Sequence, residues 1–180
     1  DSMAVRSCYP IAKRLCENLC ASYAQEYGVP TKVIRLAQTF GSGVLKNDQR
    51  VFAEFARDAM EGRDIVLQTT GSSKREYLYT ADAVTAILTV LLHGEIGKAY
   101  NAGNPDTYCS ITEMAQLVAT QIAKNKIEVQ IPKNVIDNQH RFPPPHHLHL
   151  DVSKLEQLGW KPTKGLKEMY LRMMAGMEGE

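Results

Sequence analysis

The stretch RSCYPIAKR at residues 6–14 decides the fold, because it places Tyr9 four residues before Lys13. Apolar residues continue the pattern at helical spacing: Ile11, Leu15, Leu19, Ala21 and Tyr23. The pattern predicts a helix from Tyr9 to Tyr27 that ends at Gly28. On such a helix Tyr9 and Lys13 share one face, about 6 Å apart along the axis.

The rest of the chain alternates between short β-branched runs and helical patterns. We expect strands at residues 31–37, 65–67, 99–103 and 127–131, and an extended segment at 75–79. Helices are expected at 50–62, 83–93, 152–158 and from 163 onward, and the capping box Ser110-Ile111-Thr112-Glu113 opens one more. The alternation predicts an α/β fold.

Composition indicates a folded chain whose partners are small molecules or a second copy of itself. The 180 residues are 44% hydrophobic, and 21 basic against 20 acidic side chains give a net charge of +1. Such a balance argues against binding to nucleic acid or to an anionic membrane. The longest apolar run, at 83–92, is half of the ~20 residues that a bilayer crossing needs and is interpreted as a buried helix. With no secretory pattern at the start, we expect a cytoplasmic protein.

The four cysteines are Cys8, Cys16, Cys20 and Cys109, and their spacing does not match a metal or disulfide motif. Cys16 and Cys20 lie four apart in a helical pattern, where thiols usually act as small buried hydrophobic groups. We therefore expect reduced thiols.

Tyr9 and Lys13 form a candidate acid–base pair. A lysine ammonium beside a phenol stabilises the phenolate, which can remove a hydroxyl proton while hydride leaves the adjoining carbon. The alternative is an exposed helix pair of no consequence, because this spacing is common in proteins.

Six segments, in order, resemble motifs of the extended short-chain dehydrogenases/reductases in the NAD-dependent epimerase/dehydratase family, above all its UDP-glucuronate decarboxylase branch. They are RSCYPIAKR (6–14), RLAQTFG (35–41), RVF (50–52), GSSKREYLYTAD (71–82), YNAGNP (100–105) and LGWKP (158–162). The resemblance covers nearly the whole chain. It implies a Rossmann-type fold with a small substrate-binding domain, a cytoplasmic enzyme with NAD as cofactor, and a homodimer when the protein is intact.

The resemblance also implies how the chain is divided. Residues 1–45 are expected to be a remnant of the NAD-binding Rossmann domain with the Tyr-Lys helix, and 46–180 mainly the nucleotide-sugar-binding domain. The segment at about 79–104 is expected to return to the Rossmann domain. No glycine-rich strand-to-helix phosphate loop occurs in the sequence, so we expect the N-terminal βαβ nucleotide-binding half to be absent from it.

By resemblance, Tyr9 is the catalytic acid/base and also contacts the cofactor, and Lys13 is both its charged partner and a ligand of the NAD ribose. Gln38 and Thr39 are expected to face the nicotinamide and the sugar, and so to bind both cofactor and substrate. Gln38 departs from the family pattern, which has asparagine there, and Ser42 replaces a proline.

Arg50 and Arg75 are implied ligands of the diphosphate of a nucleotide-diphosphate sugar. A diphosphate favours planar, bidentate guanidinium donors. The alternative for Arg75 is a surface ion pair with Glu76 or Asp82.

The family usually has another phosphate-binding arginine shortly before an aspartate that matches Asp151. Here the preceding residues 146–150 read HHLHL, and Arg141 is a candidate substitute. The histidines, with His140 nearby, also admit a metal site. Solvated loop histidines are the favoured interpretation, and no metal is predicted.

The implied reaction oxidises a sugar hydroxyl, at C4, to a keto group. Epimerisation, dehydration and decarboxylation remain open, because the groups that select among them are expected before Asp1. Two alternatives are a catalytically silent module that binds a nucleotide sugar or NAD, and a 180-residue chain that is inactive by itself.

Overall fold

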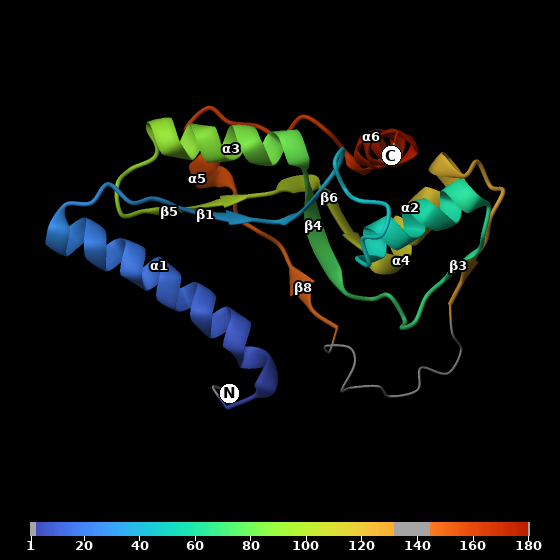
Figure 1. The fold of residues 1–180 in the computed structure, drawn as a ribbon, viewed down its shortest axis with the longest axis horizontal. Helices are drawn as coiled ribbons and strands as arrows, with labels where there is room; N and C mark the ends of the chain where they lie inside the picture. The colour runs from blue at the N-terminus through green and yellow to red at the C-terminus, as the bar shows by residue number, and fades with distance from the viewer. Residues whose placement is uncertain (1–2, 132–144, 180) are drawn as a thin grey trace.

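The computed structural model describes residues 3–131 and 145–179 and shows an α/β fold (Figure 1). The helices are α1 (Cys8–Tyr27), α2 (Val51–Glu61), α3 (Thr80–His93), α4 (Ile111–Leu117), α5 (Ser153–Glu156) and α6 (Leu166–Glu178). A 3₁₀ turn (Val5–Ser7) precedes α1, and a π-helical turn (Val118–Ile122) follows α4. The strands are β1 (Val33–Leu36), β2 (Gln38–Phe40), β3 (Ile65–Val66), β4 (Lys74–Tyr79), β5 (Ala99–Ala102), β6 (Asn104–Ser110), β7 (Val129–Gln130) and β8 (His147–Leu148).

Strand β4 is the centre of the largest sheet. It pairs in parallel with β2 and β8 and antiparallel with β6. Strand β6 runs along one edge of β4. Strands β2 and β8 lie along the other edge, β8 beside Lys74 and Arg75 and β2 beside Tyr77–Tyr79. Two parallel pairs, β1–β5 and β3–β7, form separate sheets.

The buried side chains form two clusters. The larger unites α2, β4, α4 and α6, and its aromatic centre consists of Phe40, Phe52, Tyr77 and Tyr170. Phe40 stacks on Phe52, with ring centroids 4.5 Å apart, and meets the other two rings edge-on. The smaller cluster lies between α3, β5 and the segment that contains Leu155 and Trp160. The expected division at residue 45 stays a prediction.

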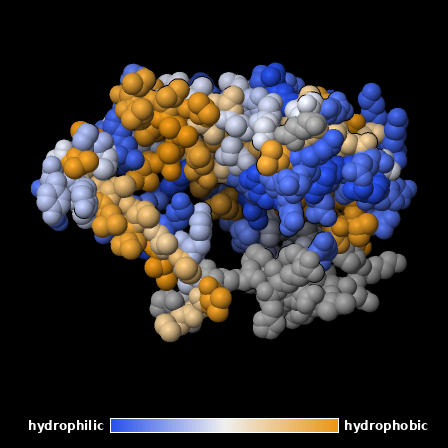
Figure 2. All heavy atoms as spheres, viewed as in Figure 1, coloured by the Kyte–Doolittle hydropathy of each residue, from blue (hydrophilic) through white to orange (hydrophobic). Residues whose placement is uncertain are grey.

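Helix α1 matches the predicted range and ends at Gly28, whose φ of 67° suits a residue without a Cβ. None of its residues is buried. The expectation of buried thiols at Cys16 and Cys20 was therefore wrong, since Cys16 is exposed and Cys20 half-buried. The expected burial of residues 83–92 holds for one face of α3 only. Its outer face exposes Leu88, Leu91 and Leu92, and Figure 2 shows hydrophobic side chains gathered over α3 and along α1.

Asp82 lies within the first turn of α3, is 4% exposed, and binds the C-terminal part of the chain. Its carboxylate accepts hydrogen bonds from the backbone N–H groups of Thr163 and Lys164 and from the Thr163 hydroxyl. Its carbonyl accepts one from Trp160 Nε1. Asp82 thus joins α3 to the LGWKP segment and to the two residues that follow it.

The capping box at Ser110 and Glu113 is confirmed, with both reciprocal hydrogen bonds formed. Strands β2, β6 and β8 were not predicted. Among the described residues, no helix is long and apolar enough to cross a membrane.

Candidate active site

The Tyr9–Lys13 pair lies at the N-terminal end of α1, on a face open to solvent. The Tyr9 side chain is 71% exposed, and Lys13 Nζ lies 5.7 Å from the centroid of its ring. Within the part of the chain that the structure describes, neither side chain makes a hydrogen bond or an ion pair. The pair therefore presents a phenol and an ammonium, side by side, to whatever binds there.

Arg75 is oriented by two neighbours on β2 and beside β8. Its Nη1 donates a hydrogen bond to Gln38 Oε1 at 3.0 Å, and its Nη2 lies 3.3 Å from His146 Nε2. Its Nε is buried without a partner in the described chain. Thr39, next along β2, turns its hydroxyl back to the carbonyl of Ala37. The alternative ion pair with Glu76 or Asp82 was wrong, because both carboxylates bind elsewhere.

Glu76, which sequence reasoning missed, fixes the segment after β8. It is 2% exposed, and its Oε1 lies 2.5 Å from His149 Nδ1 and accepts a hydrogen bond from Leu150 N. A Cβ on Gly103 would lie 2.5 Å from Glu76 Oε2, so a larger residue there would displace the Glu76 carboxylate. The histidine segment is therefore bound to β4, while His146, His147 and His149 remain exposed, as expected of solvated histidines.

Arg50 occupies the N-cap position of α2, and its side chain is bound by Asp48. The guanidinium donates to both carboxylate oxygens from Nε, at 3.0 Å each, and to Oδ2 from Nη2. Its Cζ lies 4.7 Å from the centroid of Phe52. The side-chain hydrogen bonds from Arg50 hold the pKa of Asp48 below its usual value, against a smaller opposing effect of burial. Apart from the two-residue spacing, nothing in the sequence indicated that Asp48 and Arg50 would pair.

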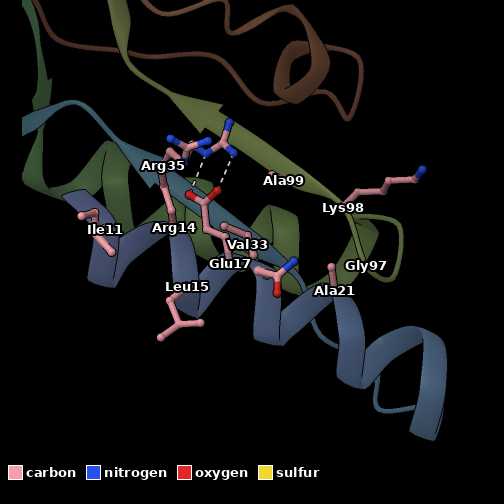
Figure 3. Close-up of a pocket in the computed structure, with 11 residues that line it drawn as sticks. Ile11, Arg14, Leu15, Glu17, Ala21, Val33, Arg35, Gly97, Lys98 and Ala99 are labelled. Carbon is pink, nitrogen blue, oxygen red and sulfur yellow. Dashed lines mark hydrogen bonds and ion pairs between the residues drawn. The ribbon is translucent and has the colours of Figure 1, made fainter. Parts of the chain in front are cut away.

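A groove of about 720 Å³ lies between α1 and the β1–β5 pair (Figure 3). Its lining includes Leu15 and Val33, and the ion pair of Glu17 with Arg35 crosses it. None of the predicted site residues lines it, so the groove is not the candidate site.

The structure brings some of the predicted residues together and not others. Gln38 and Arg75 are in contact, whereas no contact within residues 3–131 and 145–179 joins the Tyr9–Lys13 pair to them or to Arg50. Arg141 and His140 lie outside the described residues. Within those residues, no group of three His, Cys, Asp or Glu side chains could hold a metal ion.

The chain is similar in sequence to a known protein family and to curated proteins. The model of the NAD dependent epimerase/dehydratase family matches residues 1–103. UDP-glucuronic acid decarboxylase 1 of Danio rerio is 33% identical over 164 residues, which are 91% of this chain and 37% of that protein.

Solved structures share the fold. Pal from Bacillus thuringiensis superposes with a TM-score of 0.78 at 23% identity, over 95% of this chain and 53% of that one. UDP-glucose 4-epimerase of Thermus thermophilus, solved with NAD, has a TM-score of 0.75 at 24% identity, over 95% and 54%. The chain thus spans less than two thirds of each relative. The family match over more than half of its length, and the ordered motifs, show that the chain belongs to the NAD-dependent epimerase/dehydratase family.

Proposed function

We propose that the complete protein uses NAD to oxidise a hydroxyl of a nucleotide-diphosphate sugar, at C4, to a keto group, and that Tyr9 and Lys13 carry the proton transfer. The observation that carries the proposal is the ammonium of Lys13 beside the exposed ring of Tyr9. The family match and the resemblance of the chain to a UDP-glucuronic acid decarboxylase support a sugar nucleotide, and a UDP-sugar first, as the substrate.

The exposed side chains of Tyr9 and Lys13 fit the ribose part of a dinucleotide cofactor. An exposed ammonium and phenol with no competing hydrogen bond in the described chain suit a ribose hydroxyl and a reacting sugar hydroxyl. Bound NAD would supply the hydride acceptor. Tyr9, as phenolate, accepts the hydroxyl proton at its oxygen, and Lys13 stabilises the phenolate before that transfer.

Arg50 and Arg75 are the proposed ligands of the diphosphate. Arg75 gives one Nη1 hydrogen to Gln38, so the amide fixes the plane of the guanidinium while other N–H groups remain for an anion. Phosphate oxygens suit such planar donors. Gln38 thereby contributes to diphosphate binding by orienting Arg75. The asparagine of the family pattern is shorter and would not make the same hydrogen bond to Arg75.

The keto group permits more than one second step. It acidifies the neighbouring C–H bonds and weakens a β-carboxylate, so epimerisation, dehydration and decarboxylation all follow from the same first step. The proposal covers the oxidation and leaves the second step unassigned.

The test uses the protein expressed from its complete gene. We expect NADH absorbance to appear when NAD and a UDP-sugar are added, and Tyr9→Phe to lower its rate of formation about 10²- to 10⁴-fold. Tyr27→Phe is the matched control, because Tyr27 is 69% exposed at the other end of α1. Tight UDP-sugar binding without NADH from any UDP-, CDP- or dTDP-sugar would favour the catalytically silent module instead.

The 180-residue chain by itself is expected not to bind NAD. The sequence has no glycine-rich loop that opens a helix and could hold the pyrophosphate. Calorimetry with NAD checks this expectation, and micromolar binding would contradict it.

A further inference from the structure

Asp48 occupies one edge of the Arg50 guanidinium and leaves the opposite edge open. Nε and Nη2 of Arg50 donate to its carboxylate, and the backbone N–H of Arg50 donates to Oδ1 at 2.9 Å. A guanidinium has five N–H groups, so both Nη1 hydrogens and one on Nη2 point away from Asp48. One Nη1–H and the remaining Nη2–H lie parallel and form a second planar fork, and the Arg50 side chain is 51% exposed.

Asp48 is itself held in place. Its side chain is only 14% exposed, and Arg57, almost two turns into α2, donates from Nη1 to the backbone carbonyls of Lys46 and Asp48. The ring of Phe52 covers one face of the Arg50 guanidinium. Arg50 is thus bound along one edge and one face by groups that are themselves anchored to α2.

We propose that Asp48 is a positioning residue for substrate binding: it holds Arg50 so that the free Nη1–Nη2 edge is directed at the diphosphate of the nucleotide sugar. The inference rests on the proposed function. A long arginine side chain loses rotamer freedom when it binds an anion, and a guanidinium already fixed by Asp48 has less to lose. The carboxylate also cancels the charge of Arg50, so its benefit has to come from orientation and not from attraction.

A second pair on α2 shows what a closed arrangement looks like. Asp58 accepts from Nε and Nη2 of Arg63, as Asp48 does from Arg50, but Glu61 pairs with Nη1 of the same guanidinium. Both edges of Arg63 are therefore occupied by carboxylates. Asp58 has the same pairing chemistry as Asp48 without an open edge, which makes it the matched control.

The experiment measures UDP affinity by calorimetry, and kcat and KM with a UDP-sugar, on the protein expressed from its complete gene. We expect Asp48→Asn to raise the UDP dissociation constant and KM about tenfold, because the amide NH₂ cannot accept from Arg50, while kcat stays within about twofold. Asp58→Asn should leave all three constants within about twofold. In an Arg50→Ala background, Asp48→Asn should have no further effect on UDP affinity, since the group that it positions is gone.

The outcomes separate the two proposals. If Arg50→Ala weakens UDP binding but Asp48→Asn leaves it unchanged or tightens it, the positioning role is wrong and the diphosphate role of Arg50 stands. If Arg50→Ala itself has no effect on UDP affinity, the diphosphate assignment in the proposed function fails. Should Asp48→Asn not fold, Asp48→Glu replaces it: the added methylene displaces the carboxylate from the Nε–Nη2 edge, and at least a threefold loss of UDP affinity is expected, whereas an unchanged affinity would overturn the proposal.

Discussion

Helices α1 and α2 both carry apolar residues at helical spacing, but their surroundings are very different. The 20 residues of α1 bury no side chain, whereas the 11 residues of α2 bury four: Phe52, Ala53, Phe55 and Ala56. Helix α2 packs into the larger core, but α1 borders the open groove beside β1 (Figures 2 and 3). The comparison teaches that periodicity shows which face of a helix is apolar and does not show what covers it. The proposed catalytic pair therefore lies on the loosely packed element, and Arg50 on the firmly packed one.

Truncating one side chain on each helix tests the difference in packing between α1 and α2. In the 180-residue chain, Phe52→Ala should lower the free energy of unfolding by about 3–5 kcal/mol, because Phe52 is fully buried against Phe40. Leu15→Ala should change it by less than about 0.5 kcal/mol, since Leu15 is 56% exposed. Urea unfolding measures both values. Equal losses would show that α1 is as firmly packed in solution as α2.

Thiol labelling tests the same difference between α1 and the core through the reactivity of two cysteines. Cys16 on α1 is exposed, whereas Cys109 on β6 is buried, and burial raises the pKa of the Cys109 thiol to about 11 from an ordinary 9.0. Two pKa units leave about a hundredfold less thiolate near pH 8, and the thiolate is the reactive form. We expect Cys109 to react with a disulfide reagent at least about a hundredfold more slowly than Cys16 in the folded chain, and at a similar rate in urea. Similar rates without urea would mean that β6 opens readily.

The smallest expected effect concerns the ion pair that joins α1 to β1. The hydrogen bonds from Arg35 hold the pKa of Glu17 below its ordinary value near 4.5. Because the folded-state pKa is the lower one, the pair stabilises the chain above the ordinary value, and this contribution is lost as the pH falls through the folded-state pKa. The partners are 51% and 30% exposed, so Glu17→Gln should cost less than about 1 kcal/mol at pH 7. Urea unfolding at pH 7 and pH 3 measures the cost, which should be smaller at pH 3; a cost that is the same at both pH values would show that packing, and not charge, is lost.

Local patterns allowed much of the fold to be predicted. The helix from Tyr9 to Tyr27, its end at Gly28 and the capping box at Ser110 depend on residues within a few positions of each other, and the structure has all three. Strand β6 was missed because Pro105 and Asp106 disfavour a strand locally, and its pairing with β4 overrides that preference.

The candidate site was harder to predict from the sequence than the fold was. Resemblance supplied Gln38 and Arg75, and the structure adds that they touch. The pairs Asp48–Arg50 and Glu76–His149 were missed for different reasons. The first is local, yet nothing in the pattern distinguishes it from other surface charges; the second joins residues 73 positions apart, whose proximity only the fold determines.

Strand β4 has a consequence for the order in which the chain folds. Its partners on one edge, β2 and β8, lie on opposite sides of it in the sequence, and Lys74 pairs with His147. The edge stays partly open during synthesis until the ribosome has released the chain past residue 148. Pairing over such a separation is slow compared with helix formation, so the ordering of β8 is expected to be a late event in folding. Arg75 acquires its neighbour His146 only at that stage, so the surroundings of Arg75 are completed after β2, β4 and β6 have been synthesised.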